Sequence, residues 1–279
     1  MPEGDSVWRA GRQLNRGLAD QVVVRSDFRV PRHATADVSG RRIIGTQTHG
    51  KHLLTRFDGD LTLHTHLRMD GDWAVLRPGR RVPARLAGDV RVLIETDTGR
   101  QALALRTPVV GLMRTGAEKR VTGALGPDPL RHDWDAAEAV RRLGAQPTRP
   151  LVAALLDQRL LAGLGNLWVN ELLFVRGHSP WTAAGEVDLT RLVSMAARML
   201  RHSITVQGNG QVTTGDTRPG HEHWVYGRSG QPCRRCRTPV RHVGEVAGDA
   251  ERRATWWCPY CQPGPGPDSH RRPIRERSS

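Results

Sequence analysis

The first three residues of the chain, Met-Pro-Glu, could supply a covalent nucleophile. Removal of Met1 would leave Pro2 with a secondary amine beside the carboxylate of Glu3. Such an amine can attack a carbon atom and form an iminium (Schiff base) intermediate. An α-amino group has a reference pKa of about 8, against about 10.4 for lysine, so a larger fraction is neutral at pH 7. Most chains that begin with Met-Pro do no chemistry there, and an inert terminus is the alternative.

The four cysteines form two CxxC pairs, separated by residues 237–257. Two such pairs on tight turns provide the four thiolates of a tetrahedral zinc site. Four thiolates leave no open position on the metal, so the site would stabilise structure rather than catalyse. Two redox dithiols are the alternative, but they more typically accompany a βαβ pattern, which is absent. We expect one structural Zn²⁺ held by Cys233, Cys236, Cys258 and Cys261.

The formal net charge of +14 indicates a polyanionic partner, and nucleic acid is favoured over a membrane. Almost all of the positive charge is arginine, and the two lysines are Lys51 and Lys119. Coding preference explains this bias, yet Lys51 stands out because lysine gives up a proton more readily than arginine. The sequence has neither an apolar stretch of membrane-spanning length nor an apolar signal region. We expect a soluble cytoplasmic protein.

The elements that would position these residues change in type along the chain. Residues 6–18 predict a helix with Val7, Ala10, Leu14 and Leu18 on one face and Asp5 as its N-cap. Short strand-like runs between turns then predict an antiparallel sandwich or barrel. These runs span residues 21–24, 41–48, 52–57, 61–67, 72–76, 90–96 and 101–107.

Helical periodicity replaces the strand pattern after about residue 127. Helices are predicted over residues 135–143, 148–161 (capped by Thr148), 166–177 (capped by Asn166) and 188–204. Gly163 and Gly165 form a turn that would let the backbone approach a partner closely. The free N–H groups of a helix starting at Asn166 would suit a DNA phosphate. Residues 207–222 are interpreted as a linker, and the Pro-rich basic tail 263–279 as disordered.

Other polar and aromatic residues have two readings. Arg252 and Arg253, between the cysteine pairs, could bind a phosphate or simply be solvated. His64 and His66 fall on one strand face and could bind a metal, although a packed pair is commoner. Three tryptophans near the cysteines could pack against them or touch bases: Trp224, Trp256 and Trp257.

Six motifs together resemble the formamidopyrimidine-DNA glycosylase/endonuclease VIII family, over roughly residues 2–262. They are PEG, GKHLL, HLRMDG, LGPDPL, LLDQRLLAGLGNLWVNE and VYGRSGQPCRRC…WWCPYCQ. The resemblance implies an α+β multidomain fold with an N-terminal β-sandwich, a helical domain containing a helix–two-turn–helix, and a C-terminal zinc-finger β-hairpin. We expect boundaries at 2–120, 128–220 and 223–262, followed by the tail 263–279.

The resemblance also implies a bifunctional DNA glycosylase/AP lyase of base excision repair, acting on damaged DNA, and we expect a monomer. Pro2 matches the Schiff-base nucleophile and Glu3 the general acid that assists opening of the sugar ring. Lys51 matches a lysine that contacts phosphate and assists β-elimination. Asn166, with Gly163 and Gly165, matches the phosphate-binding turn of the helix–two-turn–helix. Arg253 matches the zinc-finger arginine assigned to phosphate binding and δ-elimination. Arg68 and Met69 match the wedge that fills the gap left by a flipped base.

The sequence departs from the family at two places. Gly4, Asp5 and Ser6 stand where a second Pro-Glu often occurs, so Asp5 is the candidate replacement for the second carboxylate. The arginine/phenylalanine loop of the formamidopyrimidine branch is absent, and residues 106–113 are the nearest segment. The PEG start resembles endonuclease VIII, so oxidised pyrimidines are the predicted lesions and oxidised purines the alternative. A DNA-binding protein that has lost its chemistry is the competing hypothesis.

Overall fold

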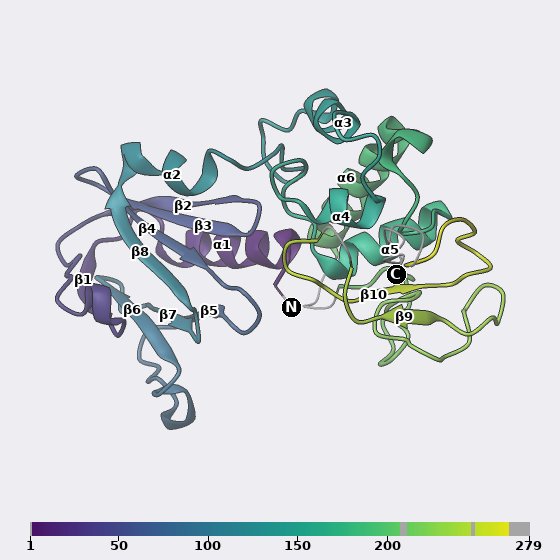
Figure 1. Ribbon diagram of the computed structural model, residues 1–279. Helices are drawn as coiled ribbons and strands as arrows, with labels where there is room; N and C mark the ends of the chain where they lie inside the picture. Colours follow the sequence, from purple (N-terminus) through teal and green to yellow (C-terminus); the bar gives the residue numbers. More distant parts are fainter. Residues whose placement is uncertain (1, 207–210, 247–248, 268–279) are drawn as a thin grey trace, which may run out of the picture. The chain divides into compact units, whose positions relative to one another are not determined.

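The computed structural model describes residues 2–206, 211–246 and 249–267, which fall into two compact units (Figure 1). The first unit runs to Leu125 and includes Leu130–His132, and the second comprises Gly126–Pro129 and the chain from Asp133 onward. The predicted four-part division stays a prediction. Met1, residues 207–210 of the predicted linker and residues 268–279 of the predicted tail lie outside the described residues. No helix in the described ranges is long and apolar enough to cross a membrane.

The first unit contains two four-stranded antiparallel sheets, with strand orders β1-β6-β7-β5 and β2-β3-β4-β8 (Figure 1). Their inner faces enclose one hydrophobic core, so the predicted sandwich is confirmed. The strands are β1 Val23–Phe28, β2 Ile43–His49, β3 His52–Phe57, β4 Leu61–His66, β5 Asp72–Leu76, β6 Val90–Thr96, β7 Gln101–Leu105 and β8 Val109–Arg114.

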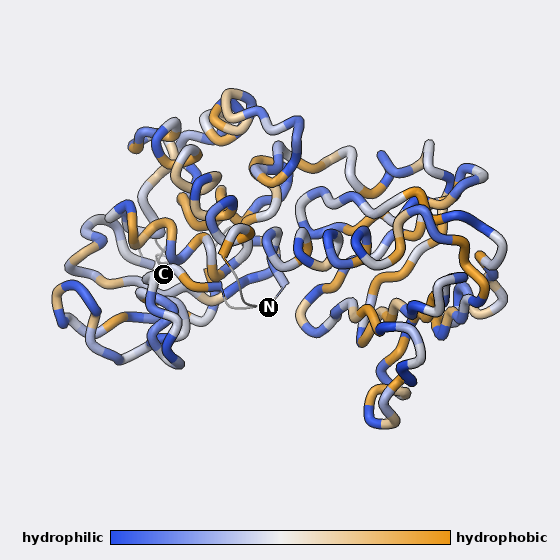
Figure 2. Tube along the Cα trace, turned by 180° about the vertical axis from the view of Figure 1, so that it is seen from behind, coloured by the Kyte–Doolittle hydropathy of each residue, from blue (hydrophilic) through white to orange (hydrophobic). Residues whose placement is uncertain are grey.

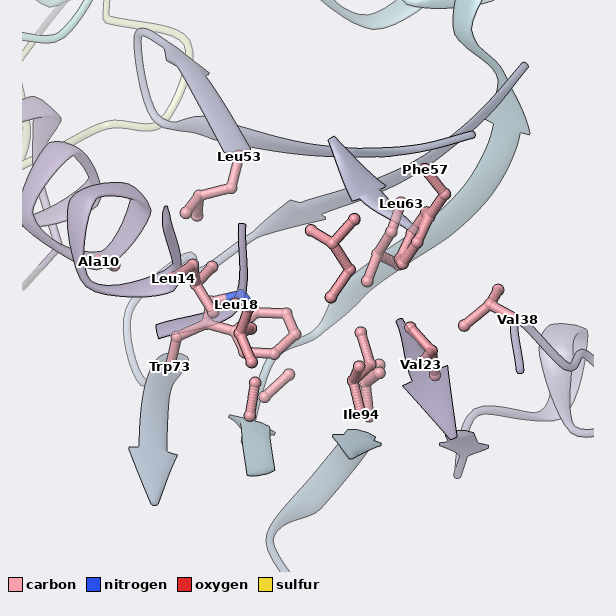
Figure 3. Close-up of a cluster of buried hydrophobic side chains, with 14 of the residues drawn as sticks. Ala10, Leu14, Leu18, Val23, Val38, Leu53, Phe57, Leu63, Trp73 and Ile94 are labelled. Carbon is pink, nitrogen blue, oxygen red and sulfur yellow. The ribbon is translucent and has the colours of Figure 1, made fainter. Parts of the chain in front are cut away.

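Helix α1 (Gly4–Leu18) packs against β2 and β5, the edge strands of the two sheets, and covers one side of the sandwich. Its apolar stripe enters the core, where Leu14 and Leu18 lie near Trp73 (Figure 3). Burial of each leucine side chain stabilises the unit by about 1.5–3 kcal/mol. The amide of Asn15 also donates to and accepts from the backbone of Thr46, both at 2.6 Å, so the side chain pairs with the free edge of β2.

The predicted N-cap of α1 is wrong. The cap is Glu3, in extended conformation, and the helix begins at Gly4. Asp5 lies inside the first turn, fully buried, with its carboxylate 3.2 Å from the Nη1 atom of Arg9 one turn further along. Because its side chain pairs along the helix with Arg9, Asp5 is a helical residue rather than the cap.

The second unit holds the predicted helices and a small two-stranded sheet. The helices are α3 Ala136–Gly144, α4 Leu151–Leu156, α5 Asn166–Arg176 and α6 Leu189–Thr205, and the strands are β9 Arg241–Val243 and β10 Thr255–Trp257. Figure 2 shows hydrophobic stretches running through both units between mainly hydrophilic loops. Helix α5 is buried nearly all round, which fits a helix at the centre of its unit.

Two boundaries in the second unit differ from the predictions. Helix α4 is capped by Pro150 rather than Thr148 and ends at Leu156 instead of residue 161. The side chain of Gln158 donates to the carbonyl groups of Leu156 and Leu164, which replaces helical hydrogen bonds beyond that point. Asn166 is the first residue of α5 and not its cap, which is Gly165.

The sequence patterns also missed regular structure in the first unit. Most of the segment 106–113, compared above with the family's intercalating loop, forms strand β8, which pairs with β4. Residues of β8 are only partly buried, so the alternation of apolar and polar residues is weak there. The short helix α2 (Lys119–Thr122) and three 3₁₀ turns of this unit were not predicted either: Pro31–His33, Ala84–Leu86 and Thr115–Ala117. A further 3₁₀ turn, Ala184–Glu186, was missed in the second unit.

Candidate functional site

Pro2 and Glu3 lie at the N-terminal end of the 15-residue helix α1. The side chain of Glu3 is fully buried, and its backbone N–H donates to Ser6 Oγ at 3.5 Å. Pro2 is half-buried and directly precedes this cap. The N-terminus of a helix carries partial positive charge, which stabilises a carboxylate and a developing negative charge. The fold therefore keeps the Glu3 carboxyl group out of bulk water and next in sequence to the proline.

A tight turn joins β4 to β5 and thereby carries the chain from one sheet of the sandwich to the other. Arg68 adopts a φ of 53°, and a Cβ atom on Gly71 would lie 2.5 Å from the carbonyl oxygen of Leu67. Only glycine fits at position 71 without moving the backbone. The turn exposes the side chain of Met69 (61%). An apolar side chain held outward on a constrained turn suits insertion between bases.

Lys51 occupies the two-residue turn of the β2–β3 hairpin, directly after Gly50, whose φ is 57°. Its charge acts on His66, at the end of β4, so the two side chains belong to one electrostatic neighbourhood. His66 Nδ1 accepts a hydrogen bond of 3.1 Å from the backbone N–H of Arg68. A neutral His66 ring therefore carries its proton on Nε2. This links the hairpin lysine to the turn that exposes Met69.

The predicted histidine pair is part of a larger cluster on β3 and β4. His52 Nδ1 lies 2.8 Å from His64 Nε2, and the His66 ring packs edge-on against His52 with centroids 4.8 Å apart. Burial, with charge from the neighbouring histidines, lowers the pKa of His52 to about 3. Burial, with the charges of Arg68 and Lys51, lowers the pKa of His66 to about 4. His64 and His66 thus pack with His52 in one cluster, and the cysteines alone form a group of possible metal ligands among the described residues, which supports the packing interpretation over metal binding.

The turn between α4 and α5 is fixed by one side chain. Gln158 Oε1 accepts from the backbone N–H of Gly163, while its amide group donates to Leu156 and Leu164. Gly163 has a φ of 95°, which favours glycine, and Gly165 caps α5. These bonds hold the start of α5 in one conformation.

The finger, residues 223–262 in the described part, is attached to α5 through buried polar side chains. Asn166 Nδ2 donates to the carbonyl of Ala254 at 2.8 Å, and Asn170 Oδ1 accepts from the backbone N–H of Trp256 at 2.7 Å. The buried carboxylate of Glu171 accepts from three successive backbone N–H groups, at residues 224–226. Asn166 therefore lies directly against the strand that follows Arg253.

The four cysteines converge as predicted. Their sulfur atoms lie within 4.8 Å of one another, and they are the one group of three or more possible metal ligands among the described residues. The 3.4 Å separation of Cys236 and Cys258 is far longer than a disulfide bond of about 2.05 Å. A tetrahedron with metal–sulfur bonds of about 2.3 Å has edges of about 3.8 Å, so these sulfurs could hold a metal ion.

Aromatic side chains pack around the cysteines. Phe174 of α5 and Trp224 stack in this cluster, with the guanidinium of Arg235 4.5 Å from the Phe174 ring centre. Trp256 belongs to the same cluster, and Trp257 packs edge-on against Trp181. The three tryptophans near the cysteines therefore pack the finger, as one of the two readings predicted.

The two finger arginines differ in environment. Arg252 is exposed, has a φ of 48°, and lies 3.6 Å from Glu245. The guanidinium of Arg253 binds Asp249 through two hydrogen bonds, from Nε at 2.9 Å and from Nη2 at 2.6 Å. Burial raises the pKa of Asp249, but hydrogen bonds from Arg253 outweigh it and leave the pKa below its ordinary value. The Arg253 side chain is therefore held in place, just before strand β10 of the finger.

The predicted residues fall into one set in each unit. The first unit holds Pro2, Glu3, Lys51, Arg68 and Met69, and the second holds Gly163, Gly165, Asn166, Arg253 and the cysteines. Sequence reasoning missed His52, Asn170, Glu171 and Asp249 as partners of these residues. Asn170 and Glu171 had a signal, because they are polar residues within an otherwise apolar helix. Asp249 had none, since it reads as an ordinary loop residue.

Comparison with known proteins matches one family model to the sandwich and another to the helices of the second unit. A family model described as the formamidopyrimidine-DNA glycosylase N-terminal domain matches residues 1–108, and one described as the formamidopyrimidine-DNA glycosylase H2TH domain matches residues 125–214. The chain is 46% identical, over 96% of both chains, to the "Probable endonuclease 8 2" of Streptomyces coelicolor. It is 40% identical to the "DNA-(apurinic or apyrimidinic site) lyase Nei2" of Mycolicibacterium smegmatis, over 94% of this chain and 99% of the relative.

Solved structures share the fold. A Lactococcus lactis formamidopyrimidine-DNA glycosylase bound to abasic-site DNA superposes with a TM-score of 0.76 at 24% identity, covering 94% of this chain and 100% of that chain. The sequence identities to the curated relatives extend over nearly the whole length of both proteins. The chain therefore belongs to the formamidopyrimidine-DNA glycosylase/endonuclease VIII family.

Proposed function

We propose that Pro2 is the nucleophile of this protein, a bifunctional DNA glycosylase and AP lyase of base excision repair that acts on damaged DNA. The observation that supports this most is the position of Pro2 at the start of α1, followed by the fully buried carboxyl group of Glu3. After removal of Met1, the proline amine attacks C1′ of the damaged nucleotide and the N-glycosidic bond breaks. The departing base takes up a proton, and the amine remains joined to the sugar.

Glu3 acts as the general acid in this proposal. It donates a proton to the ring oxygen of the sugar, so the ring opens and the proline nitrogen becomes an iminium. The iminium accepts electrons when a C2′ proton leaves, which expels the 3′ phosphate by β-elimination. Loss of the 5′ phosphate by δ-elimination follows, and water then releases the proline. Proton transfer by a positioned carboxyl group typically contributes about 10²- to 10⁴-fold to the rate.

The other site residues hold the DNA. Lys51, whose charge acts on His66, is proposed to contact phosphate and assist β-elimination. Arg68 and Met69 are proposed to fill the gap left by the flipped nucleotide, and the exposure of Met69 supports this. In the second unit, the α5 turn at Gly163, Gly165 and Asn166 and the finger residue Arg253 are proposed to bind phosphates. Arg253 also takes part in δ-elimination.

The metal is proposed to be one structural Zn²⁺ bound by the four cysteines, since four thiolates in a closed set favour zinc. Oxidised pyrimidines are the proposed lesions, because the curated relatives carry endonuclease 8 names. Oxidised purines are the alternative. Excision of thymine glycol against 8-oxoguanine, from duplex and single-stranded oligonucleotides, distinguishes them. The protein is proposed to act as a monomer in the bacterial cytosol, at the nucleoid.

The nucleophile is tested by blocking its amine. Protein with a residue retained before Pro2 is compared with protein tagged at the C-terminus, by borohydride trapping on abasic-site DNA. An amide nitrogen has no available lone pair, so the blocked protein should give no covalent adduct. It should still shift the DNA in a gel, because the proposed phosphate contacts remain. Equal trapping by the two proteins would exclude Pro2 as the nucleophile and leave Lys51 as the next candidate.

A further inference from the structure

Asp249 and Arg253 form a buried ion pair in the finger, just before strand β10. Their side chains are 3% and 17% exposed, and the carboxylate accepts from Arg253 Nε, Nη2 and backbone N–H. We propose that Asp249 is a positioning residue, which holds the Arg253 guanidinium in the orientation that binds a DNA phosphate. This inference rests on the phosphate-binding role proposed above for Arg253.

The geometry divides the guanidinium into two edges. Asp249 takes the edge formed by Nε and Nη2, which fixes the plane of the group because both bonds go to one carboxylate. The Nη1 atom lies 3.7 Å from the carboxylate of Glu251, whose side chain is 61% exposed. A phosphate can replace this long, solvated contact more easily than the buried one. Asp249 thus orients the cation, while Glu251 lies where the phosphate would bind.

The backbone supports the same arrangement. Arg252 N–H donates to the Asp249 carbonyl at 3.0 Å, and Val246 N–H donates to the Arg253 carbonyl at 3.2 Å. The left-handed φ of Arg252 turns the chain so that residues 249 and 253 face each other. An arginine side chain that is already ordered loses less conformational entropy when it binds, typically about 0.5–1.5 kcal/mol for such a side chain, or about two- to twelvefold in affinity.

Asp249 and Glu251 make a matched pair of variants. Asp249→Asn and Glu251→Gln each remove one negative charge from the same loop, and by charge alone each should strengthen DNA binding. The positioning role predicts the opposite for Asp249 only. In Asp249→Asn the amide oxygen can still accept from the backbone N–H of Arg253, but the amide nitrogen repels the guanidinium. The loop keeps its turn, and the guanidinium loses its fixed plane.

The test measures binding to a duplex containing a tetrahydrofuran abasic analogue, by fluorescence anisotropy over a series of salt concentrations. We expect Glu251→Gln to bind at least as tightly as the unchanged protein. Asp249→Asn should bind about three- to tenfold more weakly. Its salt dependence should stay that of the unchanged protein, because the guanidinium still reaches the phosphate, whereas the salt dependence of Arg253→Ala should fall by about one phosphate contact. In the Arg253→Ala background, Asp249→Asn should cause no further loss.

Metal content is measured for each variant, and equal content shows that the finger is intact. Tight binding by Asp249→Asn, or equal weakening in the Arg253→Ala background, overturns the inference. Arg253→Lys is a second test that leaves Asp249 in place. Lysine cannot bind the carboxylate with two bonds and still reach a phosphate, so it should bind as weakly as Arg253→Ala. Lysine restoring full affinity also overturns it. If Arg253→Ala itself binds and cleaves normally, the proposed role of Arg253 fails instead.

Discussion

At the scale of single residues, two fully buried carboxyl groups lie at the start of α1: Glu3 is its N-cap and Asp5 is in its first turn. Glu3→Gln keeps the size and the oxygen acceptor of the cap, so α1 should stay folded, but it removes the proton donor. We expect opening of the sugar ring, and with it iminium formation and strand cleavage, to slow by about 10²- to 10⁴-fold. Single-turnover cleavage of abasic-site DNA measures this, and circular dichroism checks the fold.

Asp5→Asn is the matched control for this prediction. Asp5 binds Arg9 at 3.2 Å, so its carboxylate already has a structural partner in the helix. We expect the Asn variant to be less stable than the unchanged protein and to cleave abasic-site DNA at a rate within a few-fold of it. A loss as large as that of Glu3→Gln would show instead that Asp5 supplies the second carboxylate that the family often has.

At the scale of elements, the histidine cluster on β3 and β4 makes the sandwich sensitive to acid. The pKa of His52 is lowered to about 3 and that of His66 to about 4, chiefly by burial. An unfolded histidine has a pKa of about 6.5, so the unfolded chain binds more protons than the native chain between about pH 6.5 and 4. The contribution of these histidines to stability is therefore fully present above pH 6.5. It is lost as the pH drops toward 4, by up to about 1.4 kcal/mol per pH unit for each histidine.

Urea unfolding at pH 7 and pH 5 measures this loss. The double variant His52→Asn/His64→Asn should have a smaller difference between the two pH values, because two of the titrating rings are gone. His202→Asn, which changes an exposed residue of α6, should keep the full difference. An unchanged difference in the double variant would mean that acid destabilises the protein through other groups.

The elements also show how far the sequence determines the prediction. Helix α1 was predicted because one face is apolar, and strands β2 to β7 because they are short apolar runs between turn residues. The end of α4 was missed because Gln158 bonds to the backbone of Leu156 and Leu164 just beyond it. The cap of α5 was missed because the Asn166 side chain bonds to the distant carbonyl of Ala254. The Asp249–Arg253 pair depends on the left-handed turn at Arg252, and an arginine gives no signal of that conformation.

The candidate site residues also divide into those that the sequence predicts and those that it does not. Pro2, Glu3 and the cysteines could be found from residue type and spacing, because amine nucleophiles and thiolate sites require those residues. The partners of the candidates lie far away in sequence, as Asn166 and Ala254 do. No local pattern encodes such a contact, since it arises only when α5 and the finger pack together.

At the scale of the whole molecule, the two units should respond differently to loss of the metal. The core of the first unit contains only its own residues, including Leu14 and Trp73. The finger core instead includes Cys233 and Cys258, together with Phe174 of α5. Structural zinc in small units contributes about 10–16 kcal/mol, so removal should unfold the finger and leave the sandwich folded.

Hydrogen exchange followed by mass spectrometry distinguishes the two units after treatment with a zinc chelator. Amides of β9 and β10 should exchange rapidly, and those of β3 and β4 should stay protected. DNA binding should fall because Arg253 loses its place, and Cys236→Ser should give the same pattern without chelator. Protection of β10 in metal-free protein would mean that Asn166, Asn170 and Glu171 hold the finger to α5 without zinc. Their buried hydrogen bonds would then be the main anchor of the finger.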